Sequence, residues 1–204
     1  MNAAISRLFS AAEKDAPGDD EYLGMAVNSA LVILGVRRGA RLDLGIKRDG
    51  HLWRALATTR GYRLVAWDER QREIPWPEPL FLKAKHAREA AGLSGDDTEL
   101  ANVRLMAKLL GYPECRGSQV ASATLLFRLQ RGLGDRSSPV FLAGVKCSKA
   151  KVKKAGLLLQ SWADAGNREM AGEAYSCGGQ TIRVHFYARI DVWTSKGKLK
   201  VTSD

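Results

Sequence analysis

Five lysines between residues 146 and 154 form the densest cluster of charge in the chain, with no acidic residue among them. They are Lys146, Lys149, Lys151, Lys153 and Lys154. We expect a helix at residues 148–165, and lysines at a helix N-terminus oppose its dipole at a cost of roughly a few tenths of a kcal/mol each. Binding to phosphate groups is the simplest function for such a cluster, and an ordinary solvated surface is the alternative.

A second group of candidate binding residues lies in residues 180–193 (QTIRVHFYARIDVW), whose strict alternation predicts a strand. One face carries apolar residues such as Phe186, and the other carries Arg183, His185, Tyr187 and Arg189. A buried face would leave the guanidinium groups without partners, so this face is expected to be wet or to hold a ligand. An aromatic ring between arginines suits single-stranded nucleic acid, because the ring can stack on a base while the arginines contact phosphates. The alternative is an ordinary solvated sheet face.

The composition agrees with a polyanionic partner. The 204 residues carry a formal net charge of +10, with a pI near 9.7, and nucleic acid is the expected partner of such a protein. No apolar run approaches the ~18 residues of a membrane span, and the N-terminus lacks the features of a secretory signal. We therefore expect a cytoplasmic protein. Its cysteines, Cys115, Cys147 and Cys177, form no C-x-x-C pair and are expected to be reduced and free of zinc.

Residues 41–68 allow two interpretations. In one, a strand at 41–47 leads through Asp49-Gly50 into a helix that ends at Gly61, and a strand follows at 63–67. In the other, Asp49-Gly50 is the two-residue turn of an antiparallel hairpin. The apolar spacing after the turn favours the helix, with Leu52, Trp53, Leu56 and Ala57 on one face.

In the helical interpretation, residues 41–68 resemble part of the ParB/sulfiredoxin superfamily. Members carry a strand, a D-G-x-x-R-x-x-A-x-x-x-x-G-like turn and helix, and another strand, and the positions of Gly50, Ala55 and Gly61 fit this pattern. Leu52 and Trp53 stand where the family has polar and arginine residues. The resemblance implies weak nucleotide binding by Asp49, Gly50, His51 and Arg54.

Two further helices are expected at residues 97–110 and 118–131, each with a capping residue before it and a glycine after it. Together they predict a helix-turn-helix, in which Ser118 and Gln119 would lie near base edges. An ordinary helical hairpin is the alternative. ParB-like proteins place such a motif after the nucleotide-binding domain, and the order is the same here.

The sequence contains no specific catalytic motif. H-E-x-x-H, P-loop and G-x-S-x-G patterns are absent, and the three histidines are not spaced for a metal. Carboxylates at Asp43 and Asp49 could join Asp68 or Glu69 in the metal site of a nuclease. We expect no cofactor, and a non-catalytic protein is favoured.

The expected fold is α+β, with a mixed sheet, several packed helices and a C-terminal β-hairpin. A proline-rich segment at 75–79 divides the chain into 1–74 and 80–204, unless the two parts form one compact domain. Three functions remain open. The first is a nucleic-acid-binding component of a plasmid, phage or ribonucleoprotein system, and the second is a ParB/sulfiredoxin-like nucleotide-dependent DNA-binding protein or nuclease. The third is an inhibitor or interaction protein that docks on another macromolecular machine.

Overall fold

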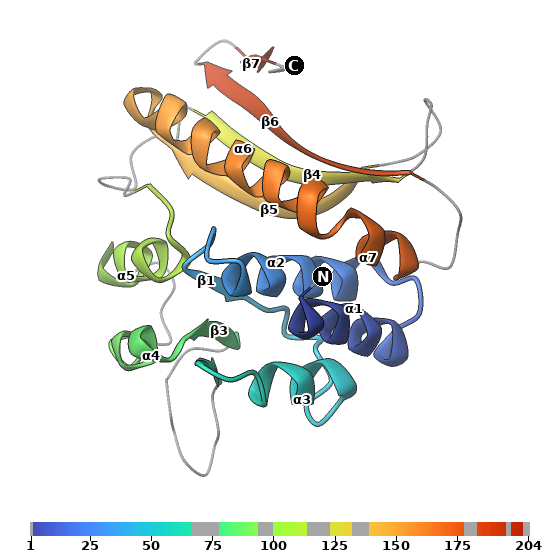
Figure 1. Ribbon diagram of the computed structural model, residues 1–204. Coiled ribbons are helices and arrows are strands. Elements are labelled where there is room, and N and C mark those ends of the chain that lie inside the picture. The colour runs from blue at the N-terminus through green and yellow to red at the C-terminus, as the bar shows by residue number, and fades with distance from the viewer. Residues whose placement is uncertain are drawn as a thin grey trace.

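The computed structural model describes residues 2–66, 78–93, 100–113, 123–131, 139–177, 183–194 and 197–201. In these residues, helices pack against two sheets, which confirms the predicted α+β fold (Figure 1). The helices are α1 (Ala3–Asp15), α2 (Asp20–Ile33), α3 (His51–Ala57), α4 (Ala84–Ala90), α5 (Leu100–Leu110), α6 (Val152–Glu169) and α7 (Ala171–Ser176), and a short 3-10 helix, η1 (Lys149–Lys151), precedes α6. None of the described helices has the length and apolar character that a membrane span requires.

Helix α2 lies at the centre of the fold, and all its residues from Tyr22 to Val32 are buried. The Asp19 carboxylate caps it by accepting the N–H groups of Glu21 and Tyr22 at 2.8 and 3.0 Å. The helix ends at Ile33, and Gly35 after it takes a left-handed φ of 77°. It packs against α1, β5 and α6, so its whole circumference is covered.

The smaller sheet is antiparallel, with the order β1-β3-β2. Its strands are β1 (Gly39–Arg41), β2 (Tyr62–Val65) and β3 (Leu80–Lys83). Helix α4 follows directly after β3. The sheet joins residues from both sides of the proline-rich segment, and the main core likewise draws on both predicted parts.

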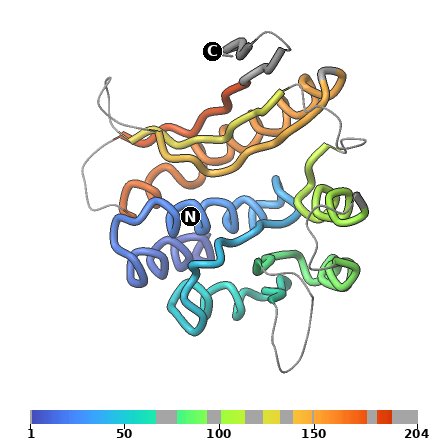
Figure 2. The backbone as a smooth tube through the Cα atoms, turned by 180° about the vertical axis from the view of Figure 1, so that it is seen from behind, coloured from blue at the N-terminus to red at the C-terminus, as the bar shows by residue number. Residues whose placement is uncertain are grey.

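The larger sheet is also antiparallel and has the order β5-β4-β6-β7. Its strands are β4 (Ala123–Arg131), β5 (Val140–Cys147), β6 (Val184–Thr194) and β7 (Gly197–Val201). Helix α6 covers one face, where buried Trp162 meets Phe127 edge-on with the ring centroids 5.8 Å apart. Seen from behind, the strands lie in front of α6, so the opposite face of the sheet is not covered by this helix (Figure 2).

Several sequence predictions are wrong. Residues 123–131 form β4 and not the second helix of a helix-turn-helix, because burial alternates with a period of two along the segment. The structure has two sheets, both antiparallel, where one mixed sheet was expected, and β5 lies at the edge of the larger sheet. The C-terminal hairpin of β6 and β7 is confirmed.

Residues 41–68 contain the helix of the first interpretation and not the hairpin of the second. Helix α3 follows Asp49-Gly50, Gly61 takes a φ of 84°, and β2 comes next. The strand predicted at 41–47 is wrong beyond Arg41. The chain there forms a loop held by the Tyr22 hydroxyl, which accepts the N–H of Lys47 at 2.9 Å.

Candidate nucleic-acid interface

The face of the larger sheet that points away from α6 brings together polar, basic and aromatic residues from three strands. In β4, buried and half-buried residues alternate. Leu125 and Phe127 are buried on the side of α6, and Leu126 and Arg128 are only half-buried. Residues paired directly across a sheet share a face, so the strand register assigns the rest. We call this surface the outer face. Its members with described side chains are Thr124, Leu126, Arg128 and Gln130 of β4, His185, Tyr187 and Arg189 of β6, and Phe141, Gly144 and Lys146 of β5, and the register also pairs Asp191 of β6 with Thr124.

Arg128 occupies the middle of this surface. It pairs with Phe141 on one side and with Tyr187 on the other, so a cation stands between two aromatic residues. A register shift after Phe127 produces this arrangement, because Phe127 pairs with Ala143 while Arg128 pairs with Phe141. Without that bulge, Phe141 would turn toward α6, whereas its side chain is 58% exposed.

The charge of Arg128 has no counter-charge in the part of the chain that the structure describes. Its Nε atom is buried and has no hydrogen-bond partner there. Leaving a buried donor unpaired costs about 1–3 kcal/mol. An anion on the outer face would offset that cost, so this side chain is suited to meeting a phosphate.

The neighbouring rows extend the same pattern. Gln130 pairs with His185, and Leu126 pairs with Arg189. The rings of His185 and Tyr187 are nearly parallel, with an interplanar angle of 5° and centroids 6.3 Å apart. Flat groups spaced along one strand in this way offer successive stacking surfaces for bases.

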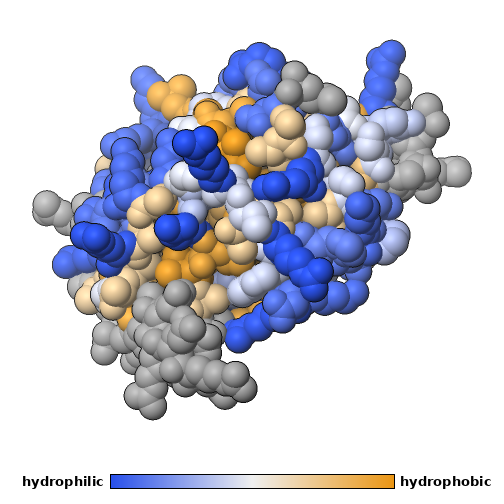
Figure 3. All heavy atoms as spheres, turned by 60° about the horizontal axis from the view of Figure 1, so that its bottom comes forward, coloured by the Kyte–Doolittle hydropathy of each residue, from blue (hydrophilic) through white to orange (hydrophobic). Residues whose placement is uncertain are grey.

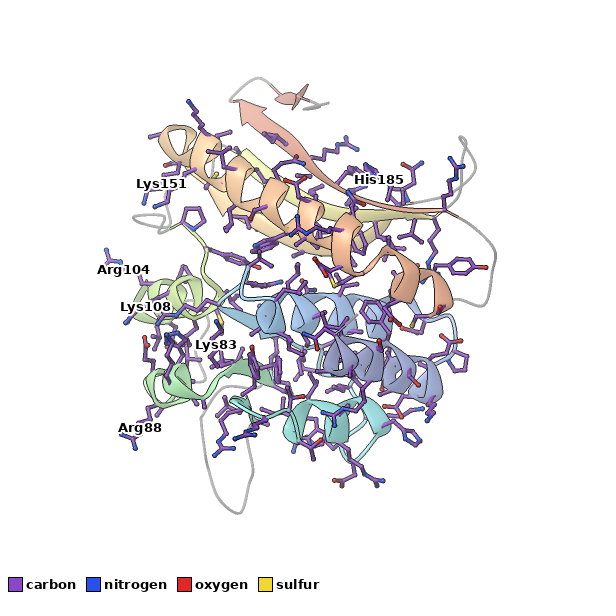
Figure 4. The ribbon with its side chains drawn as sticks, viewed as in Figure 1. Lys83, Arg88, Arg104, Lys108, Lys151 and His185 are labelled. Atoms are coloured by element: carbon purple, nitrogen blue, oxygen red, sulfur yellow. The ribbon has the colours of Figure 1, made fainter. Side chains whose placement is uncertain are left out.

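The structure brings only part of the predicted lysine cluster to this surface. Lys146 lies on the outer face, opposite Thr124. Lys149 and Lys151 form η1, and the exposed Lys153 and Lys154 begin α6, which packs on the opposite face. Figure 4 places Lys151 at the start of α6 and His185 toward the other end of the sheet. Arg183 is exposed just before β6 begins.

The turn implied by the ParB/sulfiredoxin resemblance lies elsewhere, at the N-terminus of α3. The carboxylate of Asp15 accepts the N–H groups of His51 and Leu52 at 2.9 and 2.8 Å. A Cβ on Gly50 would lie 2.7 Å from this carboxylate, so the glycine permits the contact. The backbone donors that the resemblance would assign to a phosphate therefore bind a side chain of the protein itself. Arg54 is exposed on α3, and the surface seen from this side shows hydrophilic side chains around a central group of apolar ones (Figure 3).

The remaining candidates give no site in the described residues. Ser118, Gln119, Asp68, Glu69 and Cys115 lie outside them. No group of three or more potential metal ligands occurs within the described ranges. Cys147 and Cys177 are free and buried, and burial raises the pKa of the Cys177 thiol to about 12.

Sequence reasoning found the outer face of β6 but missed Arg128, Gln130 and Phe141. Arg128 and Gln130 were missed because residues 118–131 were expected to include a helix, and no sequence pattern singled out Phe141. The alternation ATLLFRLQR in residues 123–131 contained the signal for β4. The bulge that exposes Phe141 had no counterpart in the sequence pattern.

Comparisons with known proteins add no functional assignment. No protein-family model matches the sequence, and no curated protein or solved structure is significantly similar to the chain. Its function must therefore be argued from the residues themselves.

Proposed function

We propose that the protein binds single-stranded nucleic acid on the outer face of its larger sheet. The observation that carries the proposal is the row formed by Phe141, Arg128 and Tyr187, in which a cation without a counter-charge among the described residues stands between two aromatic residues. Bases would stack on the rings, and the guanidinium would contact the phosphate between them. Four-stranded sheets that present aromatic rings are an established platform for reading single strands.

The charge of the protein supports the same ligand. A net charge of +10 favours association with any polyanion, and the lysines at the start of α6 extend the positive charge past the end of the sheet. Single strands fit better than a duplex because stacking on Phe141 and Tyr187 requires bases that are free of their partners. Helix α3 takes no part in the proposed binding, because Asp15 already accepts the N–H groups at its N-terminus.

Fluorescence anisotropy with labelled single-stranded DNA, single-stranded RNA and duplexes tests this proposal. We expect both kinds of single strand to bind more tightly than a duplex, and their ratio distinguishes RNA from DNA as the preferred ligand. Tyr187→Ala should cost roughly 1–3 kcal/mol of binding, the value of one base stacked on an aromatic ring. Tyr175→Ala on α7 removes a half-exposed tyrosine away from the outer face and is the matched control.

Two outcomes would overturn the proposal. One is equal or tighter binding of duplexes by the wild-type protein. The other is a Tyr187→Ala variant that folds normally and keeps its full affinity for single strands.

A further inference from the structure

A cleft of about 690 Å³ opens beside the outer face, between the larger sheet and helices α2 and α5. Five of its lining residues also belong to the outer face: Thr124, Leu126, Phe141, Gly144 and Lys146. The two surfaces are therefore continuous, and a single strand of nucleic acid bound to the outer face could enter the cleft past Phe141. The volume is within the usual range for a small-molecule site.

The cleft combines an apolar wall with one buried cation. Val103 and Met106 of α5 face Leu126 and Phe141 of the sheet across it, and Arg37 lines it as well. Only 4% of Arg37 is exposed. A mostly apolar lining with a few convergent polar groups is typical of sites that bind flat organic ligands.

Arg37 is held rigidly, yet it lacks a counter-charge. Its guanidinium donates to Asn28 Oδ1 and, at 2.8 Å, to the Tyr112 hydroxyl. It lies over the Trp162 ring, 4.7 Å from the ring centroid. No carboxylate in the described residues pairs with it, and its Nε atom has no partner there. Burial lowers the pKa of Arg37, Tyr112 opposes this shift, and the nearby charge of Arg41 lowers the pKa further.

Apart from Arg37, the cleft is lined by two cations, Arg41 and Lys146, and by four carboxylates, those of Asp20, Glu21, Asp43 and Glu78. Arg41 pairs with Glu78 at 2.8 Å, and Asp20 pairs with Arg131 at 3.3 Å. The carboxylates of Glu21 and Asp43 belong to exposed residues. Arg37 is thus the one buried cation of the described lining that lacks a carboxylate, and a ligand with a single phosphate group matches it better than a triphosphate.

We propose that this cleft binds one nucleoside monophosphate unit, with the base among Val103, Leu126 and Phe141 and the phosphate at Arg37. The unit is either a free nucleotide or the terminal nucleotide of a strand, and only the second case rests on the proposed function of the outer face. The apolar wall supplies the contact for a base, and the forked guanidinium supplies a planar set of donors for phosphate oxygens.

Calorimetric titration of the whole protein with nucleoside monophosphates and with the matching nucleosides tests the proposal. We expect the monophosphates to bind at least about tenfold more tightly, because a charge-assisted hydrogen bond contributes about 1.5–3 kcal/mol. Val103→Trp should fill the cleft and reduce this binding by about tenfold or more. Leu157→Trp is the control, since both residues are exposed on helices, at 46% and 66%, and Leu157 does not line the cleft.

A second comparison separates the two sources of the ligand. If the cleft takes the end of a strand, an oligonucleotide with a terminal phosphate should bind more tightly than one without it, and Val103→Trp should abolish the difference. The proposal is overturned if the folded wild-type protein binds monophosphates no better than nucleosides, or if Val103→Trp binds them as well as wild type does. Tyr187→Ala tests the outer face alone. If it loses oligonucleotide binding, the binding of monophosphates in the cleft should stay unchanged.

Discussion

Replacing Arg128 by Met tests the central assignment of the outer face. The thioether side chain keeps much of the length of the arginine stem between Phe141 and Tyr187, but it removes the charge and the buried Nε that has no partner in the described residues. Because that donor is already unsatisfied, we expect the free energy of unfolding to stay within about 1 kcal/mol of wild type, or to rise.

Binding should change much more than stability. A hydrogen bond from a charged donor to a phosphate contributes about 1.5–3 kcal/mol, which corresponds to a loss of affinity of about tenfold to 150-fold. The loss of one phosphate contact should also reduce the slope of log affinity against log salt by about 0.7 for a single strand. Anisotropy titrations of one labelled oligonucleotide over a series of salt concentrations measure both quantities.

The control for Arg128→Met is Arg168→Met. Arg168 is exposed near the end of α6, away from the outer face, so this variant loses the same charge without losing a predicted phosphate contact. We expect its salt slope to match that of wild type. A folded Arg128→Met variant with unchanged affinity and slope would refute the assignment. A fall of several kcal/mol in stability would instead give Arg128 a structural role.

Three other perturbations probe the rest of the molecule. Three lysines lie at the start of α6: Lys151, Lys153 and Lys154. Changing all three to Glu should weaken oligonucleotide binding by about tenfold or more and reduce the slope of log affinity against log salt, both measured by anisotropy. Gly166→Ala should destabilise the protein by about 1–3 kcal/mol in urea denaturation, because the new Cβ would lie 2.5 Å from Cγ of Phe186. A hydrogen bond from Lys108 lowers the pKa of Glu89 from 4.5 to about 2, so its contribution to stability is complete above pH 4.5 and is lost as the pH falls toward about 2. Urea midpoints measured over this range should show that loss in wild type and not in Glu89→Gln.

Local patterns predicted the elements whose burial is regular along the chain. In β6, alternation correctly separated buried Phe186 and Ala188 from His185 and Tyr187 on the outer face. The helix after Asp49-Gly50 was predictable for the same reason, since one stripe of apolar residues had to face the core. Each of these patterns records which side of an element meets the interior.

Long-range contacts decided the elements that local patterns misassigned. The leucines of residues 123–131 suit a helix as well as a strand, and only pairing with β5 and β6 on both sides selects the strand. The position of Phe141 depends on a bulge in the register between two strands, which no single segment encodes. The cap on α3 comes from Asp15, thirty-six residues before His51, so its effect on the predicted phosphate site could not be read locally.

Buried polar atoms without a partner in the described residues occur in several parts of the fold, and two of them lie at the outer face and at the cleft beside it. The bulge turns Phe141 outward, the Nε atoms of Arg128 and Arg37 are buried without partners in the described residues, and Arg37 has no carboxylate beside it. Each of these features costs stability, and the helices on the other side of the sheet supply the core that compensates for it. Natural proteins keep such costs mainly where a ligand repays them. We propose that the two cations and Phe141, which lies between the outer face and the cleft, belong to one surface for a polyanion with flat bases.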